Sequence, residues 1–515
     1  MSSVIDNKKI LKNTVFLYCR MFFIMIISLY TVRIVLRELG VVDYGIYNVV
    51  GSVVSLCTFL TGTLTAASNR FFSMEMVKED KSSLNKCFCL NITVFSVLML
   101  GAIVLLETVG LCYVNTKMVI PSDRLLAANV VYQLSVLSLC SSFVSIPYNS
   151  LLITHQRMSV YAYIGIAEAL LKLLIAWALL VVSYDKLIFY AALTTVANIL
   201  VTLIYYRYCR SHYEESKFHF YWNREEFNGI FKFISLYFFG SISAVIRPSG
   251  MNLLINAFFS PAINAARAIA FQVESAVMRF SDGYFSASRP QLYMAYANKE
   301  FNGLNHLIIR ITIISLFLMT LFVVPLSFNA DYVLTLWLGE VPAKAVVFMQ
   351  LVLIDSAINA SSQPVILTIL ATGKQLAYQI SEFVLRCVTL PIAYIFLLTG
   401  GEPESTAMVC IALSLVSVFM RIYFLKRQMP EFNVFRYVFT LFRIVAATVL
   451  VVLAVYAVPN ISSRFVYLLV STVVSSVVLA GALYLIALSP HDREYVHNLI
   501  MTKLFARVTH KKLNL

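Results

Sequence analysis

Charged residues are scarce in this chain. Asp, Glu, Lys and Arg make up only 13% of its 515 residues, which is about half of their share in soluble globular domains. Apolar residues make up 60%, and the 37 Phe and 29 Tyr are spread over the whole length. No stretch is polar enough for an aqueous domain. The composition therefore excludes a soluble globular protein and predicts an all-α, polytopic membrane protein.

Long polar connections and metal-binding patterns are also missing. The longest connection between apolar spans runs from Arg207 to Gly229, and the external ones are shorter, so no loop offers room for a catalytic domain. The nine cysteines include no CxxC pair and have no clustered His nearby, which argues against a disulfide framework or a zinc site. We expect small buried hydrophobes at these cysteines. We also expect no metal, no cofactor and no enzymatic activity.

Apolar stretches of about 20 residues, the length that crosses a bilayer as a helix, recur along the whole chain. We predict about fourteen transmembrane helices, at residues 14–36, 44–66, 88–107, 125–148, 159–183, 187–206, 230–256, 263–287, 307–328, 345–370, 376–398, 405–425, 441–458 and 465–488. The first of these is followed by Arg33, Arg37 and Glu38 rather than by a small-residue cleavage site. We therefore expect it to remain as a helix and not to be removed as a signal peptide.

The basic residues predict the orientation of these spans. With the N-terminus inside, the cytoplasmic connections hold most of the Lys and Arg that lie outside the spans, as the positive-inside rule requires. Both termini are therefore expected in the cytoplasm. The excess of 40 Lys and Arg over 26 Asp and Glu is then a topology signal that also suits anionic membrane lipids. It requires no nucleic-acid partner.

The few charges inside the spans recur in the same order in two halves. Arg33 matches Arg247 at an offset of 214, and Glu168 and Lys172 match Glu382 and Arg386 at the same offset. Six spans per half is an even number, so the repeat predicts two six-helix lobes in a parallel, pseudo-twofold arrangement. We expect an N-terminal lobe at 1–210, a cytoplasmic connection at 211–229, a C-terminal lobe at 230–428, two extra helices at 429–490 and a basic cytoplasmic tail at 491–515.

Two intramembrane pairs have the spacing of an ion pair within one helix. A charge at the centre of a spanning helix costs at least about 2.5–3.5 kcal/mol on insertion scales, so it usually faces the bundle interior or a wet cavity. Glu168 and Lys172 stand four residues apart, as do Glu382 and Arg386, in the order that favours pairing. The pairs either neutralise the helix for insertion or present Lys172 and Arg386 to a basic cavity, and these roles are compatible.

Arg247 is followed by Pro248, Ser249 and Gly250 in the middle of a span. This combination can kink a helix, and interrupted helices mark the binding site in several transporters. We predict a hinge at Pro248 and Gly250 and a substrate-binding role for Arg247. The alternative is an Arg that snorkels to the outer interface past a structural kink, and this alternative is stronger for Arg33, which is also a candidate.

The next spans carry further polar candidates. Arg267 shares a helix face with Glu274, either in a cationic cavity or in a structural salt bridge. Asp355, with Asn359 and Gln363, forms a polar stripe that lines a cavity or makes interhelical contacts. The candidates for coupling or charge pairing are Glu168, Glu274, Asp355 and Glu382. Basic residues outnumber acidic ones in the spans, and the first two spans contain no Asp or Glu, which favours an anionic cargo over a cation.

Four short segments resemble a known family. They are Leu39–Asn48 (LGVVDYGIYN), Asn264–Ala270 (NAARAIA), Asn69–Phe71 (NRF) and Thr372–Lys374 (TGK). With the helix count and the two-lobe repeat, they are similar to signature segments of bacterial polysaccharide-repeat-unit flippases. These flippases belong to the multidrug/oligosaccharidyl-lipid/polysaccharide exporter superfamily.

The resemblance implies flipping of an undecaprenyl-diphosphate-linked oligosaccharide, such as an O-antigen or capsule unit, across the bacterial cytoplasmic membrane. It implies a cationic cavity, which by position would include Arg247, Arg267, Lys172 and Arg386, and partners such as a glycan polymerase or a chain-length regulator. Alternating access between two lobes would expose the cavity to each side in turn. Efflux of drugs or metabolites by cation antiport is the alternative, and a membrane-embedded polymerase is less favoured. The sequence does not choose between membrane potential and ion coupling as the energy source.

Overall fold

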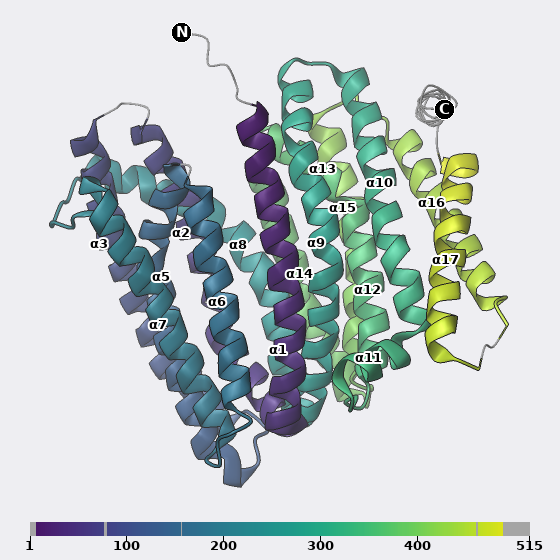
Figure 1. The fold of residues 1–515 in the computed structure, drawn as a ribbon. Coiled ribbons are helices and arrows are strands. Elements are labelled where there is room, and N and C mark those ends of the chain that lie inside the picture. Colours follow the sequence, from purple (N-terminus) through teal and green to yellow (C-terminus); the bar gives the residue numbers. More distant parts are fainter. Residues whose placement is uncertain (1–6, 77–79, 156, 460–461, 488–515) are drawn as a thin grey trace, which may run out of the picture. The chain divides into compact units, whose positions relative to one another are not determined.

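The computed structural model describes residues 7–76, 80–155, 157–459 and 462–487 (Figure 1). Every regular element in these ranges is a helix, which confirms the all-α prediction. The predicted basic tail at 491–515 lies outside the described residues, and so do both chain ends, whose cytoplasmic location therefore stays a prediction.

The first half of the chain forms seven α-helices, two of them short or bent. They are α1 (Asn7–Ser55), α2 (Thr58–Met76), α3 (Lys81–Leu105), α4 (Leu111–Thr116), α5 (Leu125–Thr154), α6 (Met158–Ala178) and α7 (Lys186–His212). A π-helical turn at Leu106–Gly110 joins α3 to α4, and single turns of 3-10 helix lie at Ser122–Arg124 and Glu214–Ser216.

The second half forms ten α-helices in the described residues. They are α8 (Arg224–Phe258), α9 (Pro261–Ala297), α10 (Phe301–Phe328), α11 (Ala330–Leu338), α12 (Ala345–Ser361), α13 (Gln363–Ala371), α14 (Leu376–Leu398), α15 (Ser405–Gln428), α16 (Val434–Tyr456) and α17 (Arg464–Ala482). A π-helical turn at Leu483–Ala487 follows α17. The short helix α11 lies where the sequence predicts only an external connection.

Each predicted span falls on one helix or on two consecutive helices. By length and composition, eleven helices of the described residues are apolar enough to cross a membrane, or up to twelve if the bent pair of α1 and α2 counts as one span. The helix α9 is not among them, because its charged and amide side chains, including Arg267 and Glu274, lower its hydropathy. The chain is therefore a multi-pass membrane protein, and a count of fourteen is compatible with its helices.

The connection predicted between the first two spans contains a glycine with non-helical backbone. Gly40 has φ 76° and ψ 168° inside α1, a positive φ that glycine adopts without the steric cost of a Cβ. Residues 56 and 57 then separate α1 from α2, and the two helices meet at 51°. The second predicted span is therefore divided between the end of α1 and the start of α2.

Helix pairings recur at the offset of the predicted repeat. The helix α1 packs on α6, and α8 packs on α14. A hydroxyl contact of 2.8 Å joins Ser141 of α5 to Thr202 of α7. In the second half, Ser414 of α15 donates a hydrogen bond of 2.5 Å to Asp355 of α12. Corresponding helices of the two halves therefore contact corresponding neighbours, as expected for a duplicated chain.

The chain divides into two compact units by contact. The first comprises residues 1–272, 334–348 and 376–413, and the second comprises residues 273–333, 349–375 and 414–515. These units group helices by packing and do not follow the two halves of the sequence. The predicted lobe boundaries concern the repeat and stay a prediction.

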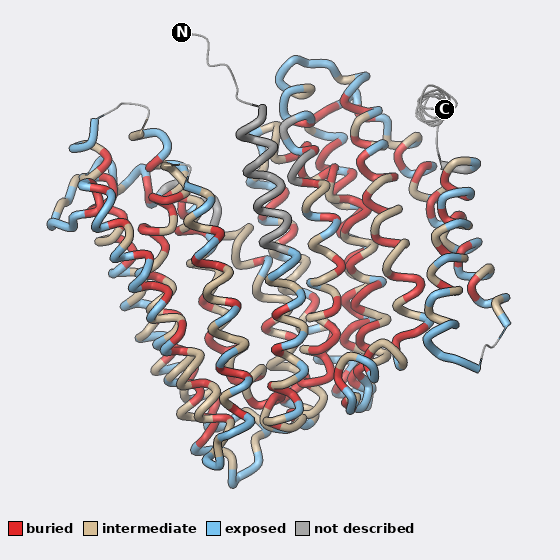
Figure 2. The backbone as a smooth tube through the Cα atoms, viewed as in Figure 1, coloured by how far each residue is buried: buried red, intermediate tan, exposed pale blue. Residues whose placement is uncertain are grey.

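Each unit has its own apolar core, and Figure 2 shows buried positions along the helices that form it. In the first unit, Phe72, Phe88 and Leu151 belong to a cluster of α2, α3, α5, α6 and α7. In the second unit, α10 packs against α16 and α17 through residues such as Leu316 and Val451. Cysteines 57, 87, 89, 209 and 410 are buried, as predicted for small hydrophobes, but Cys140 and Cys387 are half-buried and Cys112 is exposed, so the prediction is wrong for Cys112.

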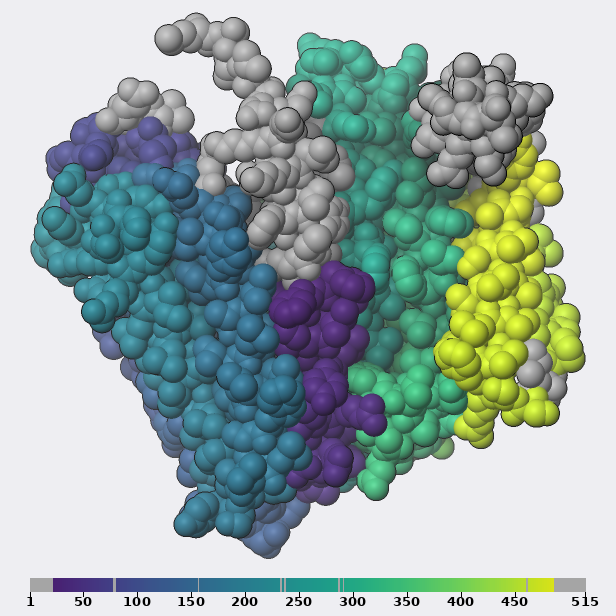
Figure 3. Space-filling view, viewed as in Figure 1, coloured from purple at the N-terminus to yellow at the C-terminus, as the bar shows by residue number. Residues whose placement is uncertain are grey.

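Large apolar side chains also cover outward faces of the helices. Val97, Leu100 and Val104 of α3 are 63%, 59% and 63% exposed. The helix α17, yellow in Figure 3, likewise presents Leu469, Val473 and Val477 outward. Such faces are stable where acyl chains, and not water, surround them.

Ion pairs tie the helix starts of the first unit together on the side predicted to be external. Arg124, just before α5, bonds Asp43 of α1 through two nitrogens and Asp185 at the start of α7 at 2.7 Å. Lys344, before α12, makes the equivalent contacts in the other half, at 2.7 Å to both Glu402 and Glu404. A basic residue before one helix therefore binds acids before another in both halves.

Acidification is expected to weaken the Arg124 cluster. Burial alone would raise the pKa of Asp185, but hydrogen bonds from Arg124 and from the backbone N–H groups of Ile188 and Leu187 outweigh it and lower this pKa. A carboxyl whose pKa is lowered by folding stabilises the protein at pH values above its ordinary pKa of 3.8. This stabilisation is lost as the pH falls through the pKa of the folded protein. Thermal unfolding temperatures measured from about pH 5 to pH 3 should therefore fall more steeply for the wild type than for Arg124→Met.

Arg464→Met is the matched control. Arg464 pairs with Asp331 at 3.2 Å with both side chains mostly exposed, and such a surface pair contributes about 0–1 kcal/mol. This variant should keep the wild-type dependence on pH. Equal slopes for the wild type and Arg124→Met would contradict the cluster's role.

Candidate functional site

A polar pocket lies among α5, α6 and α7, and its volume is about 370 Å³. We call it the three-helix pocket. Apart from Gly165 and Val201, every lining residue carries a hydrogen-bonding side chain: Ser141, Ser142, Ser145, Asn149, Tyr161, Glu168, Lys172, Asn198, Thr202 and Tyr205. Polar groups on apolar spanning helices are expensive in lipid, so they gather on the sides that face one another. The volume is in the range of small-molecule sites, about 300–1,000 Å³.

The predicted pair of Glu168 and Lys172 forms at the wall of this pocket. Lys172 Nζ lies 2.6 Å from Glu168 Oε1, and the side chains are 42% and 36% exposed. The i,i+4 spacing places both on one face of α6, so the prediction of an intrahelical pair is confirmed. The pair supplies hydrogen-bonding groups to the pocket while its net charge is zero.

A second polar pocket adjoins the first. It lies among α1, α2, α5 and α7, has a volume of about 230 Å³, and shares Ser142 and Asn198 with the three-helix pocket. Hydroxyl groups of Ser55, Thr58 and other residues line it. We call it the adjoining pocket.

Most hydroxyl protons in these walls point to the backbone. Ser142 donates to the carbonyl of Ser138 at 3.1 Å, and Ser145 donates to the carbonyl of Ser142 at 2.9 Å. Because a carbonyl can only accept, the hydroxyl oxygens keep their lone pairs for other donors. In addition, Asn149 Oδ1 is buried and has no partner among the described residues. The walls therefore offer the lone pairs of these hydroxyls, together with the ammonium group of Lys172 and the hydroxyls of Tyr161 and Tyr205.

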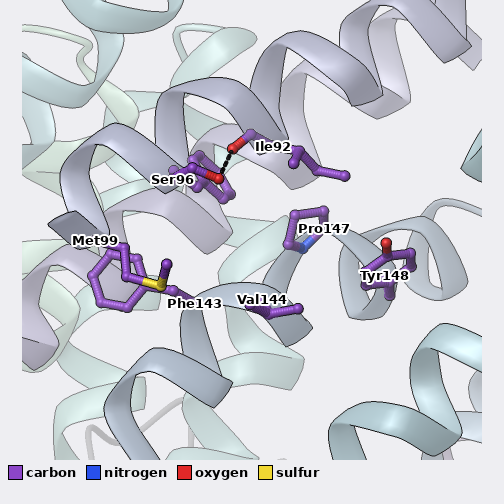
Figure 4. A pocket seen from close by; sticks show the side chains of 8 residues that line it. Ile92, Ser96, Met99, Phe143, Val144, Pro147 and Tyr148 are labelled. Atoms are coloured by element: carbon purple, nitrogen blue, oxygen red, sulfur yellow. Dashed lines mark hydrogen bonds between the residues drawn. The ribbon is translucent and has the colours of Figure 1, made fainter. Parts of the chain in front are cut away.

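A third pocket, between α3 and α5, has the opposite chemistry (Figure 4). It holds about 60 Å³ and is lined by apolar side chains, among them Met99, Phe143 and Pro147. It has two hydroxyls, those of Ser96 and Tyr148, and that of Ser96 donates to the carbonyl of Ile92 at 2.9 Å. This wall suits hydrocarbon and not a polar ligand.

Arg267 binds the helix that contains Pro248. Its guanidinium donates to the Pro248 carbonyl at 3.2 Å and to Asn252 Oδ1, and it stacks over the Phe271 ring at 4.4 Å. Asn252 in turn donates to Ser52 of α1 at 2.8 Å. Arg267 is only 5% exposed, so in this conformation it joins α9, α8 and α1 and is not open to a ligand.

The predicted hinge lies inside a continuous helix. The helix α8 runs through Pro248 and Gly250, and a Cβ at Gly250 would come within 2.7 Å of the Leu390 side chain of α14. Glycine therefore permits close packing of α8 on α14 here. The hinge stays a prediction.

The second predicted pair also forms, and it contacts the same helix. Arg386 of α14 bonds Glu382 Oε1 at 3.0 Å and the Ser243 carbonyl of α8 at 3.2 Å. The Glu382 side chain is 7% exposed and that of Arg386 is 26% exposed. Arg386 is thus held extended along α8 by a buried carboxylate.

The remaining predicted basic residues lie apart from the three-helix pocket. Arg247 is half-buried on α8. Arg33 is exposed on α1 and donates to the Leu336 carbonyl at 3.4 Å. Among the predicted site residues, the three-helix pocket therefore brings together Glu168 and Lys172, while Arg267 and Pro248 meet between α9 and α8.

The predicted acidic residues of the second unit form interhelical contacts. Asp355 accepts from Ser414, which also accepts from Asn359 at 3.2 Å. Glu274 of α9 accepts from Ser356 of α12 at 2.7 Å. These contacts tie α9, α12 and α15 together.

Sequence reasoning missed Arg421, a fully buried residue of this network. It is 2% exposed and donates to Ser362 Oγ at 2.7 Å and to Asn359 Oδ1 at 3.4 Å. Ser362 separates α12 from α13, so Arg421 binds a helix break. The sequence predicts no binding role for Arg421, because it lies one turn from the predicted cytoplasmic end of its span, where basic side chains usually snorkel. The polar stripe of Asp355 and Asn359 was the sequence pattern from which a buried partner could have been predicted.

The segment at 39–48 has structural roles that explain its composition. Asp43 binds Arg124, and Asn48 donates to the Tyr44 carbonyl at 2.7 Å. A Cβ at Gly45 would lie 2.0 Å from the Pro261 carbonyl oxygen, so only glycine permits this approach of α1 to the start of α9. Among the described residues, no group of three or more His, Cys, Asp or Glu is placed to hold a metal ion.

The fold is similar to those of membrane transporters of known structure. A lipid II flippase, MurJ, in an inward closed conformation matches with a TM-score of 0.68 and 12% identity over 94% of this chain and 99% of that chain. The MATE multidrug transporter DinF-BH, in a complex with a small molecule, matches with a TM-score of 0.59 and 14% identity over 84% of this chain and 98% of that chain.

An inward-facing multidrug resistance MATE family transporter of the MOP superfamily also matches, with a TM-score of 0.56 and 14% identity over 80% of this chain and 98% of that chain. No family model matches the sequence, and no curated protein is similar to it. The chain thus has a fold similar to those of these transporters.

Removal of the Arg267 side chain is expected to destabilise the protein. Arg267→Ala would leave the Pro248 carbonyl and Asn252 Oδ1 buried without this donor, and each unsatisfied group costs about 1–3 kcal/mol. We expect a clear fall of the unfolding temperature in detergent, with partial recovery in Arg267→Lys. Arg33→Ala removes one long, exposed hydrogen bond and should change stability by less than about 0.5 kcal/mol. A fully stable Arg267→Ala protein would contradict this placement.

Proposed function

We propose that this chain flips an undecaprenyl-diphosphate-linked oligosaccharide from the cytoplasmic to the outer leaflet of the bacterial cytoplasmic membrane. The observation that carries the proposal is the whole-length fold likeness to a lipid II flippase, which covers 94% of this chain, against 80% and 84% for the two multidrug transporters. The difference in the covered share of this chain corresponds to about the length of the segment that contains α16 and α17. This pair of helices is the part of the chain that the predicted six-helix repeat does not explain.

The basic residues within the spans suit a cargo with a negatively charged headgroup. A diphosphate sugar cannot enter hydrocarbon unaided, because an isolated charge there faces a Born cost of tens of kcal/mol. Its polyprenyl tail prefers to stay in lipid. The protein therefore has to hydrate and neutralise only the headgroup. An arginine offers paired donors that match phosphate.

We assign the diphosphate to Arg247, Arg386 and Arg33, on α8, α14 and α1. Arg386 is held extended by Glu382 and remains partly exposed. Arg267 is proposed to act through α8, because its guanidinium is engaged by the Pro248 carbonyl and Asn252. Glu274 and Asp355 stay candidates for ion coupling, with membrane potential as the other energy source.

Efflux of organic cations is the second candidate, favoured by the likeness to multidrug transporters. Such a protein needs an accessible carboxylate to bind its cargo. In the three-helix pocket the carboxylate is Glu168, which Lys172 neutralises at 2.6 Å. Sensitivity of cells to ethidium that changes on deletion of the gene, with normal glycan export, would favour this candidate.

Arg247→Ala is expected to impair flipping. In proteoliposomes that contain a fluorescent polyprenyl-diphosphate oligosaccharide, protection of the sugar from an external oxidant reports the leaflet in which it lies. Loss of one hydrogen bond to a charged group costs about 1.5–3 kcal/mol, so the rate should fall by about 10- to 100-fold. Arg247→Lys should retain part of the rate.

Arg37→Ala is the control. Arg37 is 78% exposed on α1 and lies 3.7 Å from Glu38, so its removal should leave the rate unchanged. Wild-type protein that is inactive with the lipid-linked sugar would overturn the proposed function. An active Arg247→Ala protein would overturn the assignment of this residue.

A further inference from the structure

The three-helix pocket has walls that distinguish among ligand chemistries. Ser142 and Ser145 donate their hydroxyl protons to backbone carbonyls and keep their lone pairs, and Asn198 donates to Ser138 at 2.5 Å, which leaves its carbonyl oxygen as an acceptor. A diphosphate needs net positive charge, whereas the pair of Glu168 and Lys172 gives this pocket no net charge. An organic cation would require a carboxylate that is not already paired.

We propose that the three-helix pocket binds uncharged sugar residues, and that it is a carbohydrate subsite separate from the residues that neutralise the diphosphate. Sugar hydroxyls are donors as well as acceptors, so they satisfy the lone pairs of serine, threonine and asparagine together with the ammonium of Lys172. The origin of the sugar, as the headgroup of a lipid-linked cargo, rests on the proposed function.

Asn149 provides the sharpest evidence for a missing donor. Its side-chain oxygen is buried in the pocket wall and has no partner among the described residues. A buried acceptor without a partner costs about 1–3 kcal/mol, so such groups normally have a bound donor. In this conformation the oxygen is closed off from the pocket that the residue lines, and rotation of the amide would bring it to the pocket, where a sugar hydroxyl would supply the donor.

Tyr161 and Tyr205 complete the subsite. They lie on α6 and α7, on two walls of the same pocket. Aromatic rings offer flat apolar surfaces, and their hydroxyls offer a polar tip. They suit the mixed character of a sugar ring, which has apolar C–H faces and a polar rim. The pocket of about 370 Å³ shares Ser142 and Asn198 with the adjoining pocket of about 230 Å³, so polar walls continue from one pocket to the other.

Binding of free sugars tests the subsite without the lipid. Full-length protein in lipid nanodiscs would be titrated with maltose and with N-acetylglucosamine by saturation-transfer NMR. Inorganic pyrophosphate would serve as the anionic probe and tetraphenylphosphonium as the cationic probe. Each would be added to the sugar complex, and the loss of bound sugar would be measured. We expect sugar binding that neither charged probe displaces.

Asn149→Leu is the decisive variant, because it removes an acceptor that has no partner among the described residues and should therefore leave the fold intact. Loss of one hydrogen bond to a neutral group should weaken sugar binding by about three- to tenfold. Ser96→Ala, in the apolar pocket of Figure 4, is the matched control and should bind sugar like the wild type. Unchanged unfolding temperatures of both variants would show that the fold is kept.

The outcomes separate this inference from the proposed function. Absence of sugar binding, equal binding by Asn149→Leu and wild type, or displacement of sugar by either charged probe would overturn the carbohydrate subsite, even if lipid-linked sugar is flipped normally. Sugar binding that Asn149→Leu weakens, in a protein that fails to flip the lipid-linked sugar, would uphold the subsite and overturn the proposed function.

Discussion

The whole structure depends on the need to satisfy polar groups that lipid cannot solvate. In hydrocarbon, an unpaired charge or hydrogen-bonding group is costly, so the intramembrane charges of this chain make short-range contacts. Glu168 holds Lys172 and Glu382 holds Arg386 within single helices. Arg267 and Arg421 are buried and bind backbone or side-chain oxygens of neighbouring helices. The same constraint that fixes these pairs also concentrates the remaining polar groups into pockets.

The two buried arginines both bind polar atoms close to a proline. Arg267 donates to the carbonyl of Pro248 in α8, and Arg421 donates to Ser362, where α12 ends and Pro364 begins the first turn of α13. Proline removes a backbone donor and leaves a carbonyl of the preceding turn without its usual partner. An arginine beside such a site supplies several donors in a rigid fork. In both places a guanidinium from another helix binds an oxygen near the proline, although not the carbonyl that the proline itself frees one turn earlier.

The sequence predicts the spans, the pairs and the repeat because these depend on local patterns. Apolar stretches and i,i+4 spacing are visible in the residues themselves, and Glu168 with Lys172 forms the pair that the spacing indicates. The role of Arg267 was not predictable in the same way. Its partners, Pro248 and Asn252, lie on another helix, so whether the guanidinium faces a cavity or a neighbour depends on tertiary packing. Arg421 and the shape of the three-helix pocket depend on packing for the same reason.

Serine and threonine in these helices also show how local bonding shapes a site. In a spanning helix, a hydroxyl most easily gives its proton to a carbonyl one turn earlier, as Ser142 and Ser145 do. A wall of such residues offers acceptors that carry no charge. The adjoining pocket extends this surface to Ser55, whose hydroxyl lies 2.7 Å from that of Ser249, next to Pro248. A ligand that occupies the adjoining pocket would therefore compete for a hydroxyl that links α1 to α8.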